Sequence, residues 1–170
     1  SRLEHNGAGL QSNLATQTTI EGTVVRNNSG NGILFSIRSD HNTVTGSLIV
    51  GNGLAGIWLA SSFNNLSTSF FNDSAPGAYD VQVNPGAARN RLAGNRFFGG
   101  GVVDAGNGTD SCAEPNIFGP GAAAPIERTL VAACFAIANG LDAADAEYRA
   151  DLGMQHALDR YLAEPAADAG

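Results

Sequence analysis

The segment Arg38-Ser39-Asp40-His41 combines side chains that enzymes use on acidic sugars. A lyase or epimerase acting on a uronic-acid polymer needs a base for the sugar C5 proton, and His41 oriented by Asp40 suits that role. It also needs a cation beside the sugar carboxylate, which Arg38 supplies. The segment stands in a turn in front of Asn42, so a solvated loop is the simpler interpretation. The sequence favours the loop and keeps the catalytic set as the alternative.

A second group of oxygen-bearing side chains lies in the Gly-rich segment 104–110. Asp104, Asn107 and Asp110 offer oxygen ligands of the kind that Ca²⁺ takes. The segment lacks the trailing Glu of a typical calcium loop, and a polar turn explains it equally well. We therefore expect no cofactor, with calcium at this loop as the alternative.

The chain has two cysteines, Cys112 and Cys134, which are 22 residues apart. That distance is close to the repeat described next, so a disulfide between successive turns would suit an oxidising compartment. Two buried free thiols are the alternative. No Cys-x-x-Cys motif indicates a metal site.

The elements that position these residues follow a repeat. Pairs of apolar residues recur at a step of 24 residues: Ile33 and Phe35, Ile57 and Leu59, Val81 and Val83. A second apolar series runs beside them: Ile20, Val44, Leu66 and Leu92. A period in this range indicates a solenoid whose turns bury their apolar faces against one another.

Each repeat predicts two strands joined by Asn/Gly-rich turns. The first strand covers residues 18–25, 42–49, 64–71 and 90–97, with alternate residues inward, and Arg96 at an inward position predicts a bulge or a register shift. Asn42, Asn64 and Asn90 stand at the start of three of these segments. At the corner of a solenoid such side chains lie one above another, so we expect a hydrogen-bonded Asn stack.

The phrase Gly-Ile-x-apolar, followed by Asn-x-apolar-x-Gly, resembles the repeats of right-handed parallel β-helix proteins. That family includes pectate lyase-like folds, polysaccharide epimerases and periplasmic NosD-like proteins. The resemblance covers roughly residues 17–99. It implies an all-β solenoid, a right-handed parallel β-helix of about four turns with a C-terminal α-helical segment. It does not imply one activity, because the same fold serves enzymes, adhesins and surface coats.

Outward positions of the coil are candidates for contact with a polymer. In one sheet the outward residues are hydroxyl-rich, and in the other Trp58 lies beside Leu34 and Gln82. A sugar ring can stack on Trp58, and a flat hydroxyl array suits carbohydrate or ice. Ordinary solvated surface is the alternative. The expected carbohydrate-binding residues are Thr23, Thr45, Ser47, Trp58, Ser67 and Ser69.

Composition excludes some partners and divides the chain. The formal charge is −7 and no Lys is present, so the basic patch that nucleic acid requires is missing. No apolar run of about 18 residues predicts a membrane span. We expect coils over 1–98, an irregular Gly/Pro/Ala-rich final turn or linker over 99–125, and a helical cap or docking segment over 126–165.

These observations predict a non-catalytic, secreted or cell-surface module of a bacterium, with the periplasm as an alternative location. Its role would be structural or carbohydrate-binding, with self-association into an oligomer or filament through coil ends or C-terminal helices. The alternative is a polysaccharide lyase or epimerase, or a fragment of one, acting on a uronic-acid polymer.

Overall fold

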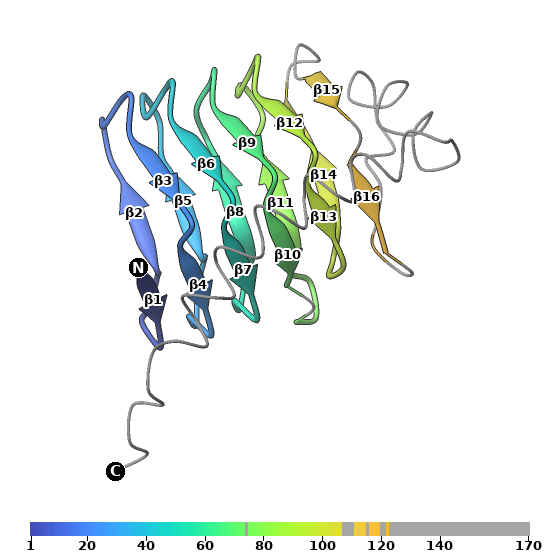
Figure 1. Cartoon of the computed structure of the whole chain (residues 1–170). Helices are drawn as coiled ribbons and strands as arrows, with labels where there is room; N and C mark the ends of the chain where they lie inside the picture. The colour runs from blue at the N-terminus through green and yellow to red at the C-terminus, as the bar shows by residue number, and fades with distance from the viewer. Residues whose placement is uncertain (74, 107–110, 115, 120–121, 123–170) are drawn as a thin grey trace.

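The computed structural model describes residues 1–73, 75–106, 111–114, 116–119 and 122, and these form a coil of short parallel strands (Figure 1). The chain visits three sheets, here called A, B and C, in that order and then returns to A. The predicted helical segment 126–165 lies outside the described residues.

Every strand belongs to one of these three sheets. Sheet A contains β1 (Arg2–Glu4), β4 (Val24–Arg26), β7 (Leu48–Val50), β10 (Phe70–Asn72), β13 (Arg96–Phe97) and β16 (Ile117–Phe118). Sheet B contains β2 (Leu10–Ser12), β5 (Ile33–Phe35), β8 (Ala55–Leu59), β11 (Tyr79–Val83) and β14 (Val102–Asp104). Sheet C contains β3 (Thr19–Glu21), β6 (Thr43–Thr45), β9 (Asn65–Ser67), β12 (Arg91–Ala93) and β15 (Ser111–Glu114).

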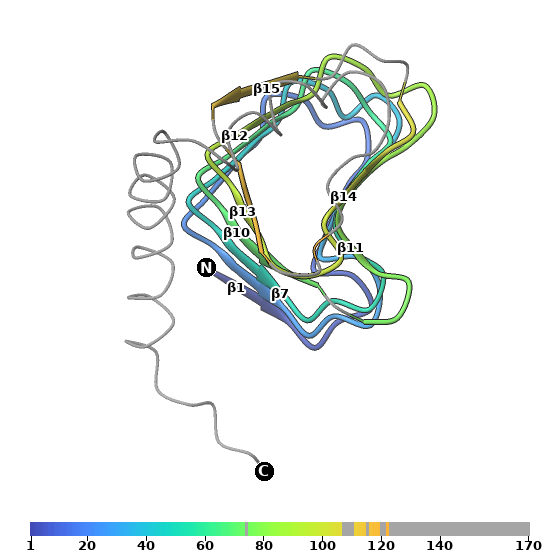
Figure 2. The same cartoon turned by 90° about the vertical axis from the view of Figure 1, so that its right-hand side faces the viewer.

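One turn of the coil therefore carries one strand of each sheet. Sheets B and C each hold five strands, so from first to last they advance by four turns, and the predicted parallel β-helix of about four turns is confirmed. With the C-terminal end of the coil towards the viewer, the chain passes anticlockwise from sheet A through B to C as it approaches (Figure 2). The coil is right-handed, as the resemblance implied.

The core is a set of apolar columns that run along the coil. The pairs on β5, β8 and β11 that define the 24-residue repeat all point inward and are 0% exposed. Opposite them, sheet A contributes stacked rings, with Phe71 and Phe97 5.0 Å apart and Phe97 and Phe118 5.1 Å apart between centroids. Because like residues stack on like in every turn, each turn buries the apolar face of the next.

The predicted first strand of each repeat is in fact two strands separated by a corner. Gly22 and Gly46 have φ of 50° and 52°, a left-handed conformation that glycine adopts without a Cβ penalty. Thr68 takes the same position in the following turn with φ of 46°. The corner shifts the inward alternation by one residue, so Val25 rather than Val24 enters the main core. Arg96 accordingly lies on an outward position, paired in register with Phe70, and needs no bulge.

The segment 99–125 continues the coil where it is described. Strands β14, β15 and β16 add to sheets B, C and A in turn. The register between β12 and β15 shifts at Leu92 and Ala93, so this last turn is less regular than those before it.

Candidate functional site

A ladder of asparagines fills the corner between sheets B and C. The Asn42 backbone N–H donates to Asn64 Oδ1 at 3.0 Å, and the Asn64 N–H donates to Asn90 Oδ1 at 3.0 Å. All three residues are 0–1% exposed. Each amide satisfies backbone donors that the corner would otherwise bury unpaired. These residues support the coil and do not face a ligand.

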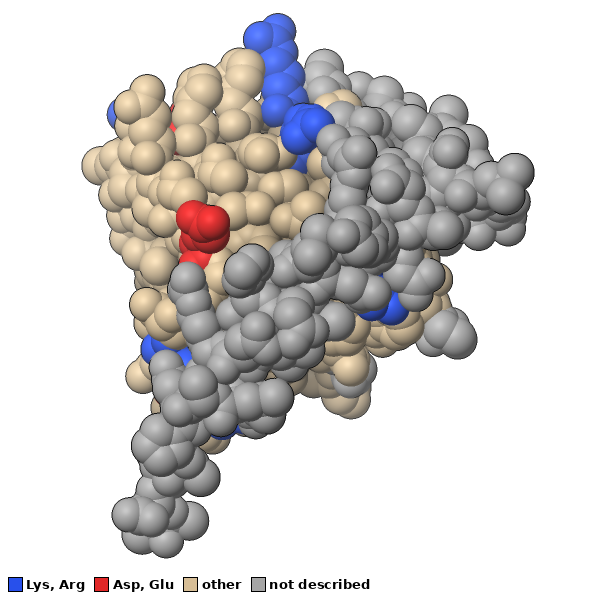
Figure 3. All heavy atoms as spheres, in the orientation of Figure 1, with Lys and Arg blue, Asp and Glu red and all other residues tan. Residues whose placement is uncertain are grey.

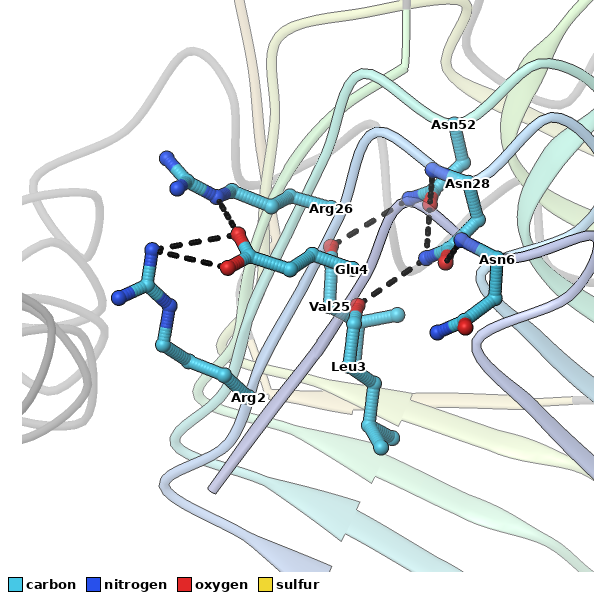
Figure 4. A network of polar contacts seen from close by, with 8 residues as sticks. All are labelled: Arg2, Leu3, Glu4, Asn6, Val25, Arg26, Asn28 and Asn52. Atoms are coloured by element: carbon cyan, nitrogen blue, oxygen red, sulfur yellow. Dashed lines mark hydrogen bonds and ion pairs between the residues drawn. The ribbon is translucent and has the colours of Figure 1, made fainter. Parts of the chain in front are cut away.

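A second ladder occupies the corner between sheets A and B (Figure 4). The Asn28 side-chain Nδ2 donates to Asn52 Oδ1 at 2.9 Å and to the Leu3 carbonyl at 3.1 Å. Asn52 in turn donates through Nδ2 to Asp73 Oδ1 at 3.0 Å. A carboxyl thus stands where the preceding turns carry an amide.

Asp73 and Asp80 form a buried carboxyl pair at the end of that ladder, and both are 0% exposed. Asp80 accepts backbone N–H groups from Asp73, Gly99 and Gly101 at 2.8–3.0 Å. Asp73 Oδ2 is buried without a hydrogen-bond partner. Burial raises the pKa of Asp73 to about 7, and burial also raises the pKa of Asp80. Nothing in the sequence predicted this pair, because the spacing of the two residues follows neither the strand alternation nor the turn repeat.

The hydroxyls at the third corner, between sheets C and A, are buried and correct our expectation. Thr23, Ser47 and Ser69 are 6%, 0% and 0% exposed, so the prediction that they form an outward array is wrong. The Thr23 N–H donates to Ser47 Oγ at 3.2 Å, and the Ser47 N–H donates to Ser69 Oγ at 3.1 Å. The left-handed residue before each of them turns the chain and carries the hydroxyl inside.

The candidate catalytic residues make structural contacts. Asp40 Oδ1 accepts the Ser62 backbone N–H of the next turn at 2.8 Å. The His41 ring stacks on Phe63, with centroids 4.8 Å apart and planes 3° from parallel. Arg38 is exposed in the same loop. The geometry directs Asp40 and His41 to the neighbouring turn and does not present them as an acid–base pair.

Phe63 and Arg89 extend this stack and were missed by the sequence reasoning. The Arg89 guanidinium carbon lies 5.3 Å from the centre of the Phe63 ring. His41, Phe63 and Arg89 each precede an Asn of the B–C ladder and have φ of 57–60°. Their shared position before a ladder Asn is the feature of the sequence from which this stack could have been predicted. Both faces of Phe63 are occupied, which leaves only its ring edge for an outside molecule.

Thr45 and Ser67 remain on the outer face of sheet C as expected. Both are half-buried, and Ser67 Oγ donates to Thr45 Oγ1 at 3.0 Å. Thr45 Oγ1 also lies 3.1 Å from Thr68 Oγ1. These hydroxyls therefore satisfy one another across the strands. They lie on a different sheet from Trp58, so the six predicted binding residues do not form one surface.

Trp58 lies at the centre of an aligned row on sheet B. We call this row the outer column of sheet B; its members, in register from β2 to β14, are Gln11, Leu34, Trp58, Gln82 and Val103. Gln11 is exposed and the other four are half-buried. In Figure 2 the trace of sheet B bends towards the interior of the coil. With strands about 4.8 Å apart, five rungs span about 19 Å.

The indole N–H of Trp58 is buried and makes no hydrogen bond. A buried donor without an acceptor carries a desolvation cost of about 1–3 kcal/mol. The column around it is uncharged. Figure 3 views the molecule from the side of sheets A and C, away from the column, and on the described residues seen there charged side chains are few and scattered.

The remaining predicted sites fall wholly or partly outside what is described. Asp104 accepts the Gly106 N–H at 2.8 Å, and burial raises the pKa of Asp104. Asn107 and Asp110, its expected partners in a calcium site, lie outside the described residues. Cys134 does too, so the expected disulfide with Cys112 stays a prediction.

Comparison with known proteins identifies the family. Residues 1–110 match the family described as periplasmic copper-binding protein (NosD). Because the match covers more than half of the 170 residues, the chain belongs to this family, and the predicted kinship with parallel β-helix repeat proteins is confirmed. No curated protein and no solved structure matches the chain.

The family description raises the question of copper, for which imidazole, thiolate and thioether are suitable ligands. Among residues 1–106, His5 lies in the A–B loop and His41 in the B–C loop. Across the described part of the chain, no group of three or more His, Cys, Asp or Glu side chains is placed to hold a metal ion. The described residues therefore do not fit a copper site.

The family is periplasmic, which confirms the expected secreted or periplasmic location. In the part of the chain that the structure describes, no helix has the length and apolar character to cross a membrane.

Proposed function

We propose that this NosD-family chain is a non-catalytic carbohydrate-binding module whose binding surface is the outer column of sheet B. The observation that carries the proposal is the register-aligned row centred on Trp58. A polysaccharide lying parallel to the coil axis would meet one side chain of the column per turn.

The chemistry of the column suits sugar rings. The Trp58 ring offers an apolar face for sugar C–H groups, and Leu34 extends that face on the neighbouring strand. Gln82 adds an amide that can exchange hydrogen bonds with hydroxyls. A small rotation of the indole would let its unpaired N–H donate to a sugar oxygen, which removes the desolvation cost noted above. The absence of charge in the column favours a neutral polymer over an acidic one.

The contacts of Asp40 and His41 support binding without turnover. A catalytic base must be free to reach the sugar C5 proton. His41 instead stacks on Phe63, and Asp40 holds the Ser62 N–H. The lyase or epimerase alternative gains no observation in its favour.

The test compares variants by affinity electrophoresis in gels that contain a neutral β-glucan, polygalacturonate or alginate. Trp58→Ala should abolish the retardation seen with the native chain, and Trp58→Phe should restore part of it. Phe63→Ala, an exposed aromatic at the B–C corner, is the matched control and should bind normally. Equal retardation of Trp58→Ala and the native chain would reject the column as the binding surface.

Self-association through the coil ends is a separate proposal. At the β1–β3 end a hollow of about 540 Å³ is lined by Leu3, Leu10 and Ile20 among others. These apolar side chains support end-to-end contact with a second copy. Light scattering across a concentration series should show mass that increases with concentration, and a constant monomer mass would reject the contact.

A further inference from the structure

Three A–B loops of the described coil contain the dipeptide Asn-Gly: Asn6-Gly7, Asn31-Gly32 and Asn52-Gly53. An asparagine followed by glycine readily loses its side-chain amide, because glycine has no Cβ to hinder attack by its own backbone nitrogen. The reaction needs an asparagine amide that is free to turn and a glycine N–H that is not held in a hydrogen bond. The three pairs are chemically equal, so their contacts in the coil decide which of them reacts.

The pair Asn52-Gly53 is held at both reacting groups. Asn52 is buried in the A–B ladder, where its Oδ1 accepts Asn28 Nδ2 at 2.9 Å and its Nδ2 donates to Asp73 Oδ1 at 3.0 Å. The Gly53 N–H donates to the Asn28 carbonyl at 2.9 Å. A Cβ on Gly53 would lie 2.4 Å from the Ser29 carbonyl oxygen, so Gly53 is packed tightly against the preceding turn. Neither reacting group can approach the other while the turns remain stacked.

The pair Asn31-Gly32 is held in the same way by β8. The Ala55 N–H donates to Asn31 Oδ1 at 3.1 Å, and the Gly32 N–H donates to the Ala55 carbonyl at 2.8 Å. Asn31 is buried, and a Cβ on Gly32 would lie 2.6 Å from the Gly56 carbonyl oxygen. This pair is therefore also protected by stacking.

The pair Asn6-Gly7 is open, because both residues are exposed. Asn6 contributes its backbone N–H to the A–B ladder, donating to Asn28 Oδ1 at 3.0 Å (Figure 4). Among the described residues, neither the Asn6 side-chain amide nor the Gly7 N–H has a hydrogen-bond partner. A Cβ on Gly7 would meet nothing within 4 Å. Both groups are thus free to move towards each other.

We propose that Asn6 is a site of spontaneous deamidation in the folded chain, and that the coil protects Asn31 and Asn52 from the same reaction. The Gly7 nitrogen attacks Asn6 Cγ, and its proton leaves with the side-chain amino group as ammonia, which closes a cyclic imide. Water then opens the imide at either carbonyl. Opening at the Cγ carbonyl gives aspartate, and opening at the backbone carbonyl gives isoaspartate. Water is the only co-reactant.

The isoaspartate product changes the first turn of the coil. In the native chain the Asn6 carbonyl accepts the Ser29 N–H at 2.9 Å, and the Gly7 carbonyl accepts the Gly30 N–H at 2.7 Å. Isoaspartate converts the first carbonyl to a free carboxylate and adds a backbone carbon between the two acceptors. The two acceptors then lose their common register with the second turn. The reaction therefore loosens the first A–B loop and adds a negative charge at the β1–β3 end.

The test follows deamidation of the full chain in mildly alkaline buffer by tryptic digestion and tandem mass spectrometry. Arg26 and Arg38 place Asn6, Asn31 and Asn52 in different tryptic peptides. In the folded chain Asn31 and Asn52 should react at least about a hundredfold more slowly than Asn6, because they react only after local opening. In urea all three should react at similar rates. Asn107-Gly108 and Asn139-Gly140 lie outside the described residues, and the spectra separate them from these three.

Gly7→Ala is the matched variant, because space around Gly7 allows the methyl group without disturbing the coil. It should keep the native circular dichroism spectrum and slow the reaction at Asn6 at least about tenfold, since the new Cβ hinders attack. Hydrogen exchange at the Ser29 and Gly30 amides should become faster in the aged native chain than in Gly7→Ala aged in parallel.

The proposal fails if Asn6 keeps its amide in the folded chain while the urea-unfolded chain reacts. Equal rates at Asn6, Asn31 and Asn52 in the folded chain would show that stacking gives no protection. An unchanged rate in Gly7→Ala would show that the Gly7 nitrogen is not the attacking group.

Discussion

The carboxylate of Asp80 accepts the backbone N–H of Asp73 at 2.8 Å, while the Asp73 carboxyl itself takes the place of an asparagine in the A–B ladder. Two acidic side chains are thereby buried together in the coil interior. Asp80 has three N–H donors around it, whereas Asp73 Oδ2 has no partner. Asp73 is therefore the group that holds a proton most readily.

This arrangement predicts that stability falls as pH rises. Burial raises the folded-state pKa of Asp73 from 3.8 to about 7, so between these values the folded state binds more protons than the unfolded state. The free energy of unfolding should decrease over this window by on the order of 4 kcal/mol and then level off above pH 7. The raised pKa of Asp80 acts in the same direction. Urea denaturation at a series of pH values measures the slope.

Asp73→Asn should reduce that slope and stabilise the chain at pH 7 and above. The amide continues the ladder. In the two preceding turns, Asn28 Nδ2 donates to the Leu3 carbonyl and Asn52 Nδ2 donates to the Val25 carbonyl. Ile49 is in register with Leu3 and Val25, so the new Nδ2 can donate to the Ile49 carbonyl. Asp40→Asn, at a half-buried carboxylate, is the control and should keep the native slope. An unchanged slope in Asp73→Asn would show that another group carries the pH dependence.

Asn64→Ala should destabilise the coil by about 2–3 kcal/mol, because the Asn42 N–H would then be buried without an acceptor. The variant also removes the Asn64 Nδ2 bonds to Ser61 Oγ and Asn90 Oδ1. Asn65→Ala, at the next residue but on the outer face, should cost less than about 1 kcal/mol. Denaturant unfolding distinguishes the two, and equal losses would mean that the ladder contributes little.

Ser69→Ala should lower stability by about 1–3 kcal/mol without changing polysaccharide affinity, because its hydroxyl accepts the Ser47 N–H inside the coil. Ser67→Ala, two residues earlier and outward, should leave stability nearly unchanged. A loss of affinity in Ser69→Ala with unchanged stability would show that Ser69 belongs to the binding surface after all.

Gly46→Ala should destabilise the corner between sheets C and A. A φ of 52° costs an alanine about 1–2 kcal/mol. Gly46→Asn should lose less, since asparagine tolerates the left-handed region better. Thermal unfolding of the two variants provides the comparison, and identical midpoints for Gly46→Ala and the native chain would contradict a strained corner.

The sequence alone predicted the parts of the coil that repeat. Ile33, Ile57 and Val81 recur at a constant step, and their inward positions on sheet B follow from strand alternation. The residues that start the 42–49, 64–71 and 90–97 segments were correctly expected to lie at a corner. These features are readable because stacking forces successive turns to use like residues at like positions.

The corner at Gly22, Gly46 and Thr68 was not predictable in the same way. Alternation of apolar and small residues looks the same whether the chain runs straight or turns, and Thr68 gives no sign of a left-handed conformation. That single corner decides which hydroxyls face outward. Because the corner at Gly46 was not predicted, Ser47 was expected on the surface, whereas it lies in the core. The Asp73–Asp80 pair was missed because Asp73 follows β10 and Asp80 lies on β11, so the two meet across the A–B loop of a single turn, and no repeat in the sequence predicts that contact.

The most direct test of the binding surface uses the fact that Trp58 is the only tryptophan of the chain. Its fluorescence can be titrated with a soluble neutral β-glucan in the native protein, with free tryptophan under the same conditions as the reference. If the polymer binds over Trp58, the protein should show a saturable change in fluorescence intensity and emission wavelength. Binding shown by gel retardation with no change in Trp58 fluorescence would contradict it, because the polymer would then occupy another face.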